Sequence, residues 1–303
     1  MTILAHGEDY FGPNGFRIQI THPHVPEGDI REPFDLTEIA HYHDFTEMVV
    51  VLSGTGIHWV EGHEYIVRAG DVFLFQGEQK HYFKEAGKLD FYNLMFDPDK
   101  LQLPTEYLTR IPGFRALFLL EPTYRVKHRF NSRLQLGDSD LSNTLHQLKR
   151  MESELKEGLP GFEASLSAKL VELMVFLGRR YSEIRTTEGT ALLRVSEVIG
   201  ALEQDYTRSW TLKELTKIAH ISESRLLVLF REATMNTPIE YLIKIRVSKA
   251  KELLLQTDHP IDQIAMKTGF SDSNYFSRQF RKGCGISPRE FRKKGSAFGQ
   301  LHT

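Results

Sequence analysis

The sequence has little cysteine and no long apolar run. Its 303 residues contain one cysteine, Cys284, so the chain can form no internal disulfide, and this usage fits a reducing cytoplasm. No stretch approaches the ~18 consecutive apolar residues of a membrane-spanning helix. The N-terminal segment carries His6, Glu8 and Asp9 where a signal peptide would have its apolar core. We therefore expect a cytoplasmic protein with no membrane segment.

Recognisable catalytic motifs are absent as well. No Ser-His-Asp arrangement and no phosphate-binding glycine loop stands out, which argues against common hydrolase and NTPase chemistry. Hydrophobic residues make up 41% of the chain and charged residues 26%, an ordinary globular composition. A chain of this length is long for one domain and comfortable for two. We expect two globular domains and no enzyme activity.

Charge is unevenly distributed along the chain. There are 38 Lys and Arg against 40 Asp and Glu, a formal net charge of −2. Residues 190–303 hold 18 of the basic residues and 12 of the acidic ones, so this part is basic and the remainder is acidic. A basic surface neutralises DNA phosphates and releases their condensed counterions. The C-terminal part is therefore where a nucleic-acid partner is expected.

Short strands are the dominant signal in the first hundred residues. Apolar runs at 47–52, 72–75 and 90–96 are separated by turn signals such as Glu61-Gly62 and Ala69-Gly70. Several short strands with regularly spaced turns are typical of a sandwich or barrel. We predict a β-barrel over residues 1–135, in which the strand that begins at Glu47 ends before Gly54.

Beyond Asp138 the apolar residues recur at helical spacing. Leu141, Leu145 and Leu148 follow an i, i+4, i+7 pattern, and a second apolar face runs through residues 160–181. We predict a helical hairpin over residues 136–181, which either supplies a dimer interface or closes the barrel core. The polar, aperiodic segment 182–190 is expected to be the interdomain linker.

An internal repeat with a shift of 50 residues occupies the C-terminal part. Phe230-Arg231 matches Phe280-Arg281, and Thr237-Pro238 matches Ser287-Pro288. Each copy reads as a short helix, a tight turn and a second helix that begins at a capping residue. This is the shape of a helix-turn-helix unit. We predict two such units, over 211–233 and 260–282, in a DNA-binding domain that spans 191–303.

A long helix is predicted between the two units. Residues 238–256 carry apolar side chains at helical spacing without a break. Such a helix would hold the two units at a fixed separation, and units about one DNA turn apart enter successive major grooves of a duplex. The expected partner is double-stranded DNA. The expected fold is an α+β multidomain chain, with an N-terminal β-barrel and helical hairpin followed by an all-α tandem helix-turn-helix domain.

The C-terminal residues resemble a known family. The stretch 249–293 is similar to the C-terminal signature of AraC/XylS transcription regulators, and the match extends over roughly 100 residues with its characteristic positions in place: Gly269, Phe270, Phe276, Phe280, Gly285, Pro288 and Phe291. The resemblance implies a DNA-binding transcription regulator. It also implies which residues of the two recognition helices read bases: Ser224, Leu227, Val228, Ser273, Asn274 and Arg278.

The first recognition helix departs from the family pattern. Leu227 and Val228 stand where polar or arginine residues are common. Such side chains can touch thymine methyl groups but cannot form hydrogen bonds with bases. Two interpretations stay open: the first unit reads sequence through these apolar contacts, or it positions the protein through phosphates while the second unit reads sequence. In the second unit, Arg278 suits guanine and Asn274 suits adenine.

Histidines concentrate the chemistry of the N-terminal part. His41, His43 and Glu47 are spaced so that a strand would direct all three to one side. With His81 they make a plausible site for a transition metal. The spacing also resembles the cupin pattern, which implies that the barrel is a double-stranded β-helix. Two positions depart from it, because Gln76 stands where proline is usual and Glu85 where asparagine is usual.

Three interpretations of these histidines remain. The residues His41, His43, Glu47 and His81 could line a ligand pocket without metal, hold a divalent transition metal that helps to bind a hydroxylated ligand, or belong to a cupin enzyme fused to a DNA-binding domain. Sensory cupins of the AraC family usually work without metal. We therefore expect a sensor with no cofactor and keep the metal-containing sensor as an alternative.

Residues 41–75 resemble the rhamnose-responsive activators of the same family. The similarity lies in the His-x-His-Asp-Phe run, the following Glu-x-Val-x-Val and the Gly-x-Gly-x-His segment. It implies a sugar such as L-rhamnose as effector. We expect a cytoplasmic homodimer that activates carbohydrate-metabolism genes through contact with RNA polymerase. Trp59 would then stack on the sugar, or it is a plain core aromatic. The four histidine and glutamate side chains would bind its hydroxyl groups.

Overall fold

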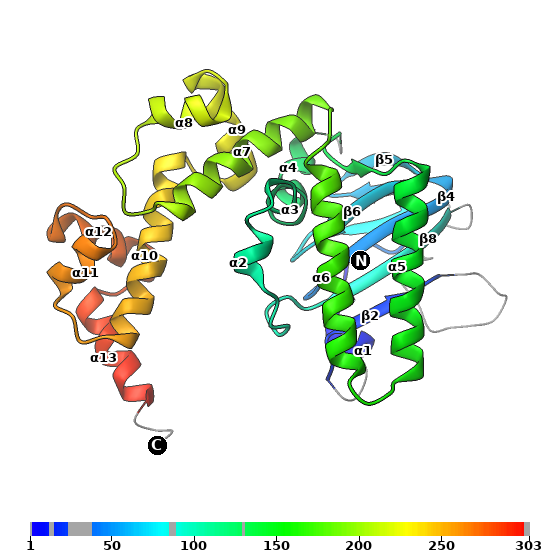
Figure 1. Ribbon diagram of the computed structural model, residues 1–303, viewed down its shortest axis with the longest axis horizontal. Coiled ribbons are helices and arrows are strands. Elements are labelled where there is room, and N and C mark those ends of the chain that lie inside the picture. Colours follow the sequence, from blue (N-terminus) through cyan, green and yellow to red (C-terminus); the bar gives the residue numbers. More distant parts are fainter. Residues whose placement is uncertain (1, 12–14, 24–37, 85–88, 129–130, 300–303) are drawn as a thin grey trace. The chain divides into compact units, whose positions relative to one another are not determined.

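The computed structural model describes residues 2–11, 15–23, 38–84, 89–128 and 131–299 (Figure 1). Glu85 lies outside these residues. The chain forms two compact units, Met1–Ser196 and Glu197–Thr303. Within the described ranges no helix has the length and apolar character that crossing a membrane requires.

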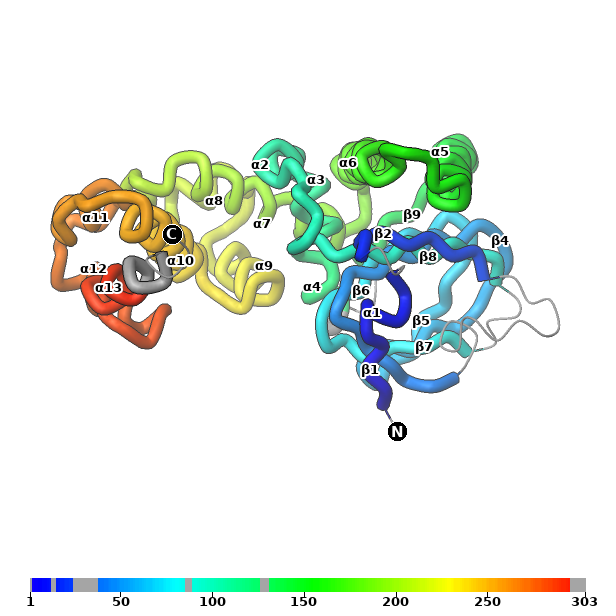
Figure 2. Tube along the Cα trace, turned by 90° about the horizontal axis from the view of Figure 1, so that it is seen from below, coloured from blue at the N-terminus to red at the C-terminus, as the bar shows by residue number. Residues whose placement is uncertain are grey.

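A curled sheet forms the body of the first unit. Its strands are β1 (Ile3–Ala5), β2 (Ile18–Thr21), β3 (His41–His43), β4 (Thr46–Val60), β5 (His63–Arg68), β6 (Asp71–Phe75), β7 (His81–Lys84), β8 (Leu89–Phe96) and β9 (Leu134–Gln135). A short helix, α1 (Gly7–Tyr10), follows β1. The β1–β3 pair is parallel and the other described pairs are antiparallel. Figure 2 shows the strands curling around a common interior. The predicted cupin-like fold of this part is confirmed.

The long strand β4 connects the two sides of the curled sheet. Its first half pairs with β6 and β8, and its second half pairs with β5 and β7. The prediction that this strand ends before Gly54 was wrong. A register shift between Val51 and Ser53 and a positive φ of 81° at Gly54 bend the strand without ending it, because glycine adopts this conformation at no steric cost.

Alternation along the strands separates the interior from the outer face. Val49, Val51, Phe73, Phe75 and Phe91 are fully buried and belong to one hydrophobic cluster. Side chains of neighbouring residues on a strand point to opposite faces. Where the side chain of a residue in β4 or β7 points into the interior, the side chains of its two neighbours in the strand therefore point to the other face.

The helical segment after β8 was not anticipated within the predicted barrel. It consists of α2 (Thr105–Leu108), α3 (Pro112–Phe114), the π-helical turn η2 (Arg115–Leu120) and α4 (Glu121–His128). Pro122 lies near the start of α4 and has no backbone N–H. The Nε2 of Gln76 donates to the carbonyl of Phe118 at 3.1 Å, and Gln79 donates to the carbonyl of Pro122. The loop between β6 and β7 is thereby joined to the helical segment.

Two long helices, α5 (Asp138–Glu157) and α6 (Phe162–Tyr181), form the hairpin that the sequence predicts. They lie side by side against the sheet (Figure 1). The start of α3 packs closely on the end of α6: a Cβ at Gly113 would lie 2.0 Å from the carbonyl oxygen of Gly178. Only glycine at position 113 permits this approach.

The linker prediction needs a correction. Helix α7 (Thr187–Gln204) includes the second half of the predicted interdomain linker over 182–190, and the division between units falls after Ser196. The Oγ1 of Thr186 accepts a hydrogen bond from the Gly189 N–H at 3.1 Å, and Glu188 lies in the first turn. These are helix-start features that the polar composition concealed.

The second unit contains the remaining helices, α8 (Leu212–Ala219), α9 (Glu223–Thr234), α10 (Pro238–Gln256), α11 (Ile261–Lys267), α12 (Ser273–Cys284) and α13 (Pro288–Gly299). The range of α10 is the one expected from the sequence. Thr211 and Thr237 form capping boxes with Glu214 and Glu240, which fixes where α8 and α10 begin. Phe276 and Phe280 are fully buried in the core of the second helix-turn-helix unit.

Candidate functional site

Each helix-turn-helix unit presents its second helix from a capped N-terminus. The Oγ of Ser222 accepts a hydrogen bond from the Arg225 N–H, and the Oδ1 of Asp272 accepts one from the Asn274 N–H at 2.8 Å. Gly269 supplies the turn of the second unit with a φ of +86°, where a Cβ would lie 2.7 Å from the Cα of Thr207. The caps and the turn fix which face of α9 and α12 is exposed.

The base-reading residues expected on α9 lie away from its core face. Leu226 and Phe230 are fully buried, whereas Ser224 is exposed and Leu227 is partly exposed. Val228 is 49% exposed. The exposed Val228 side chain offers apolar surface and no hydrogen bond.

The corresponding face of α12 is polar. Asn274 and Arg278 are exposed and Ser273 is partly exposed, while Phe276 and Phe280 hold the helix on the core. The guanidinium of Arg278 lies 5.9 Å from the ring centroid of Tyr275. Tyr275 is 37% exposed and is not among the residues predicted to read bases.

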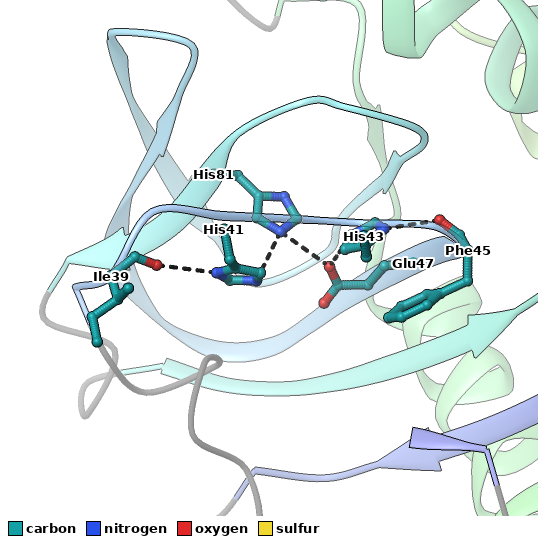
Figure 3. Close-up of polar contacts among 6 residues, drawn as sticks. All are labelled: Ile39, His41, His43, Phe45, Glu47 and His81. Carbon is teal, nitrogen blue, oxygen red and sulfur yellow. Dashed lines mark hydrogen bonds and ion pairs between the residues drawn. The ribbon is translucent and has the colours of Figure 1, made fainter. Parts of the chain in front are cut away.

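The second candidate site is a group of buried polar side chains inside the curled sheet (Figure 3). His41, His43, Glu47 and His81 are each 5% exposed or less. His81 Nε2 lies 3.0 Å from His41 Nε2 and 3.4 Å from Glu47 Oε2. His43 Nε2 lies 3.1 Å from Glu47 Oε2. The structure thus brings together all four of these predicted residues.

Backbone carbonyls orient two of the imidazole rings. His41 Nδ1 donates to the carbonyl of Ile39 at 3.1 Å, so its Nε2 has the lone pair that faces His81. His43 Nδ1 donates to the carbonyl of Phe45 at 2.8 Å. Both ring nitrogens of His43 therefore face oxygen atoms, the Phe45 carbonyl on one side and the Glu47 carboxylate on the other.

Burial sets the protonation of the other histidines. Desolvation lowers the pKa of His41 and holds the pKa of His81 well below its usual range, with the neighbouring histidines adding to the effect. His58 is 1% exposed, and burial and then the charge of Arg125 hold its pKa well below the usual range. Neutral imidazoles carry one donor and one acceptor each, which suits hydrogen bonding to hydroxyl groups.

His58 was missed when the site was predicted from the sequence. Its ring stacks on Phe83 with centroids 4.2 Å apart and lies 5.6 Å from the His81 ring. The available signal was the position itself: His58 lies two residues before Val60, which pairs with His81 across the sheet, so both side chains share the interior face.

Trp59 is not brought to the cluster. It is the neighbour of His58 in β4 and therefore lies on the outer face of the sheet. There its ring stacks on Tyr82, with centroids 5.0 Å apart, and it is partly exposed. Because Trp59 lies on the outer face, it is separated from the buried histidines and does not contribute to their site.

Three of the buried side chains could hold a metal ion. The ligand atoms of His41, Glu47 and His81 all lie within 4.8 Å of one another. Nitrogen and oxygen ligands about 2.0–2.1 Å from a zinc ion in tetrahedral geometry lie roughly 3.4 Å apart, close to the separations in the cluster. His43 is not part of this group, and its ring centroid lies 6.5 Å from that of His41.

Known proteins share both parts of this arrangement. Residues 34–174 match the family described as AraC-like ligand binding domain, and residues 215–294 match the family described as Helix-turn-helix domain. The chain therefore belongs to the AraC family and is a ligand-responsive, DNA-binding transcriptional regulator. It is a regulator and not an enzyme, which removes the interpretation of the barrel as a catalytic cupin.

Curated relatives match over nearly the whole chain. The HTH-type transcriptional activator RhaS of Enterobacter sp. (strain 638) is 28% identical over 97% of this chain and 98% of that protein. RhaS of Escherichia coli O139:H28 is 27% identical over 99% of this chain and 100% of that protein. The activator RhaR of the same Enterobacter strain is 28% identical over 84% of this chain and 86% of that protein.

Proposed function

We propose that this regulator activates transcription in response to a sugar, such as L-rhamnose, that binds at the buried histidine cluster. The observation that carries the proposal is the set of polar atoms on His41, His43, Glu47 and His81, which are gathered on the interior face of the curled sheet and linked by three contacts of 3.0–3.4 Å. Buried donors and acceptors in an apolar surround suit a polyhydroxylated ligand, since each hydroxyl group both donates and accepts.

The activating role is supported by the relatives, which are named transcriptional activators RhaS and RhaR. At 27–28% identity these names suggest a sugar and leave its identity to experiment, because effector preference changes with a few pocket residues.

Regulation would operate as a linked equilibrium. The sugar binds one conformation of the N-terminal unit better than another, and that conformation favours binding of the helix-turn-helix units to paired half-sites. A homodimer formed through α5 and α6 would supply the pair, and contact with RNA polymerase would raise transcription. The base-reading residues in this proposal are Ser224, Leu227, Val228, Ser273, Asn274 and Arg278.

A metal-containing sensor is the second candidate, favoured by the grouping of His41, Glu47 and His81. A divalent transition metal would be held there by the Nε2 atoms of His41 and His81, each neutral with its proton on Nδ1, and by the Glu47 carboxylate. The metal would then help to bind hydroxyl groups of the same sugar.

A thermal-shift series on the full-length protein tests both candidates. The protein, purified without a histidine tag, is screened against monosaccharides with and without EDTA. A ligand at ~100 times its Kd stabilises the native state by about 2.7 kcal/mol. Glu47→Gln should abolish the shift, and His63→Gln, at an exposed histidine of β5, should leave it unchanged.

The outcomes separate the candidates. A shift that survives EDTA supports the metal-free sugar sensor, and a shift lost in EDTA and restored by Zn²⁺ supports the metal-containing one. If no monosaccharide shifts the melting temperature, the sugar proposal fails and the family assignment stands.

A further inference from the structure

A groove lies in the second unit beside the recognition helix α12. It has a volume of about 390 Å³ and runs from Asn236, at the junction of α9 and α10, along α10 to the C-terminal end of α12. Ile243 and Val247 contribute apolar surface to its lining. The groove therefore borders both halves of the DNA-binding domain.

Three lysines from two helices line this groove. Lys244 and Lys251 are seven residues apart on α10, which places them on the same face two turns apart. Lys282 comes from α12, four residues after Arg278. The groove thus continues from the flank of the helix that carries the expected base-reading residues.

The charge of the groove is positive. Lys244, Lys251 and Lys282 form no ion pair with the residues that the structure describes. Glu240 is the acidic member of the lining, and its Oε2 already accepts hydrogen bonds from the N–H and the hydroxyl of Thr237, each at 2.8 Å. The ammonium groups are therefore available to an anion from outside the chain.

We propose that Lys244, Lys251 and Lys282 bind successive phosphates of the DNA backbone that passes between the two recognition helices. An extended polyanion can contact ammonium groups on two helices at once, and the duplex must cross this region if both helices enter successive major grooves. The proposal rests on DNA binding by this family. Beyond that function, it assigns three residues that contribute to DNA affinity without reading the base sequence.

The salt dependence of DNA binding tests the assignment. The full-length protein first selects its preferred duplex from a random library, and the affinity for that fluorescently labelled duplex is then measured by anisotropy over a range of salt concentrations. Each phosphate contact contributes about 0.9 to the slope of log K against log salt concentration. The triple variant Lys244→Ala, Lys251→Ala, Lys282→Ala should lose about 2.7 of that slope and keep the base preference of the unmodified protein.

Matched variants distinguish these contacts from general charge. Lys249 lies on α10 outside the groove and pairs with Glu252 at 3.0 Å, so Lys249→Ala should leave the slope unchanged. The three Lys→Arg substitutions should retain it, because the cation is kept. An unchanged slope in the triple-alanine variant would overturn the proposal, as would unchanged DNA binding with lost activation, which would assign the groove to a protein partner. Absence of DNA binding by the unmodified protein would overturn both this proposal and the regulator function.

Discussion

The two units of this regulator place their polar groups in opposite ways. The first unit buries histidines, carboxylates and the arginines Arg115 and Arg125. In the second unit, Thr268 is the buried polar residue among those that the structure describes, and the charged side chains lie at or near the surface. A group turned inward can meet a small molecule that enters the fold, whereas a group turned outward can meet a polymer too large to enter.

The difference has an energetic side. A buried ion must be paired, because leaving it alone in the interior costs several kcal/mol. An exposed ion is solvated whether or not it has a partner. The free energy of unfolding of the first unit should therefore be sensitive to single polar substitutions and to pH. That of the second unit should be tolerant of both, although its affinity for DNA should be sensitive to them.

The largest effect is expected at the buried ion pair of Arg125 and Glu121, both fully buried. Arg125→Ala strands the Glu121 carboxylate and should lower the free energy of unfolding by about 3–5 kcal/mol. Denaturant unfolding of the full-length protein measures this. Arg208, which forms an exposed pair with Glu214 and lies over the Trp210 ring, is the control, and Arg208→Ala should cost about 1 kcal/mol or less. Equal losses of unfolding free energy in the two variants would show that buried and exposed ion pairs do not differ in this protein.

A pH effect should be confined to the first unit. In the unfolded chain, histidines have the ordinary pKa of 6.5, whereas His41, His58 and His81 have lowered pKa values in the folded state. Above pH 6.5 both states are neutral and nothing is lost. Below it the unfolded state takes up protons that the folded state does not, so the free energy of unfolding falls by up to about 1.4 kcal/mol per histidine per pH unit.

Denaturant unfolding between pH 7.5 and 5.5 measures this loss. His58→Phe keeps a ring against Phe83 and should make the pH dependence shallower. The substitution His63→Gln, at an exposed position, should not. If the His58→Phe variant kept the full pH dependence of the unmodified protein, His58 would not contribute to the loss of stability at low pH.

On the outward-facing side, the two recognition helices should differ in what they read. Arg278→Ala should cost about 1–3 kcal/mol of binding at one base position and relax the preference there. Val228→Ala removes apolar contact alone and should cost less, without changing a hydrogen-bonded base. Competition binding with every single-base variant of the selected duplex measures both, and a larger loss for Val228→Ala would reverse the assignment of roles.

The smallest expected effect is at the helix caps of the second unit. Asp272→Ala removes the acceptor of the Asn274 N–H and should lower the free energy of unfolding by about 1 kcal/mol. The neighbouring substitution Ser271→Ala, at an exposed position, should leave it unchanged. Denaturant unfolding separates the two, and an equal loss at Ser271 would show that the cap is not the cause.

Much of this architecture follows from local sequence signals. The 50-residue repeat indicates both helix-turn-helix units, because capping residues and apolar spacing act within a few residues of each other. The same holds for α10, whose start at Thr237-Pro238 and uninterrupted apolar spacing are visible in the sequence. His41, His43, Glu47 and His81 could be grouped because strand alternation directs them inward.

Other features depend on distant contacts and leave little local trace. Arg125 resembles an ordinary surface arginine in the sequence, and its burial becomes clear only when Glu121 and the ring of Phe75, 4.9 Å away, are seen around it. His58 is obscured by its neighbour Trp59, the more conspicuous residue. The bend of β4 at Gly54 reads as a strand end, because a local glycine signal does not say whether pairing resumes beyond it.

The bond from Gln76 to the carbonyl of Phe118 gives a structural use to a departure from the cupin pattern. Proline is usual at this position, and a proline side chain has no group that could donate a hydrogen bond. A return to proline would therefore remove one tie between the β6–β7 loop and the helical segment, and would leave the tie from Gln79.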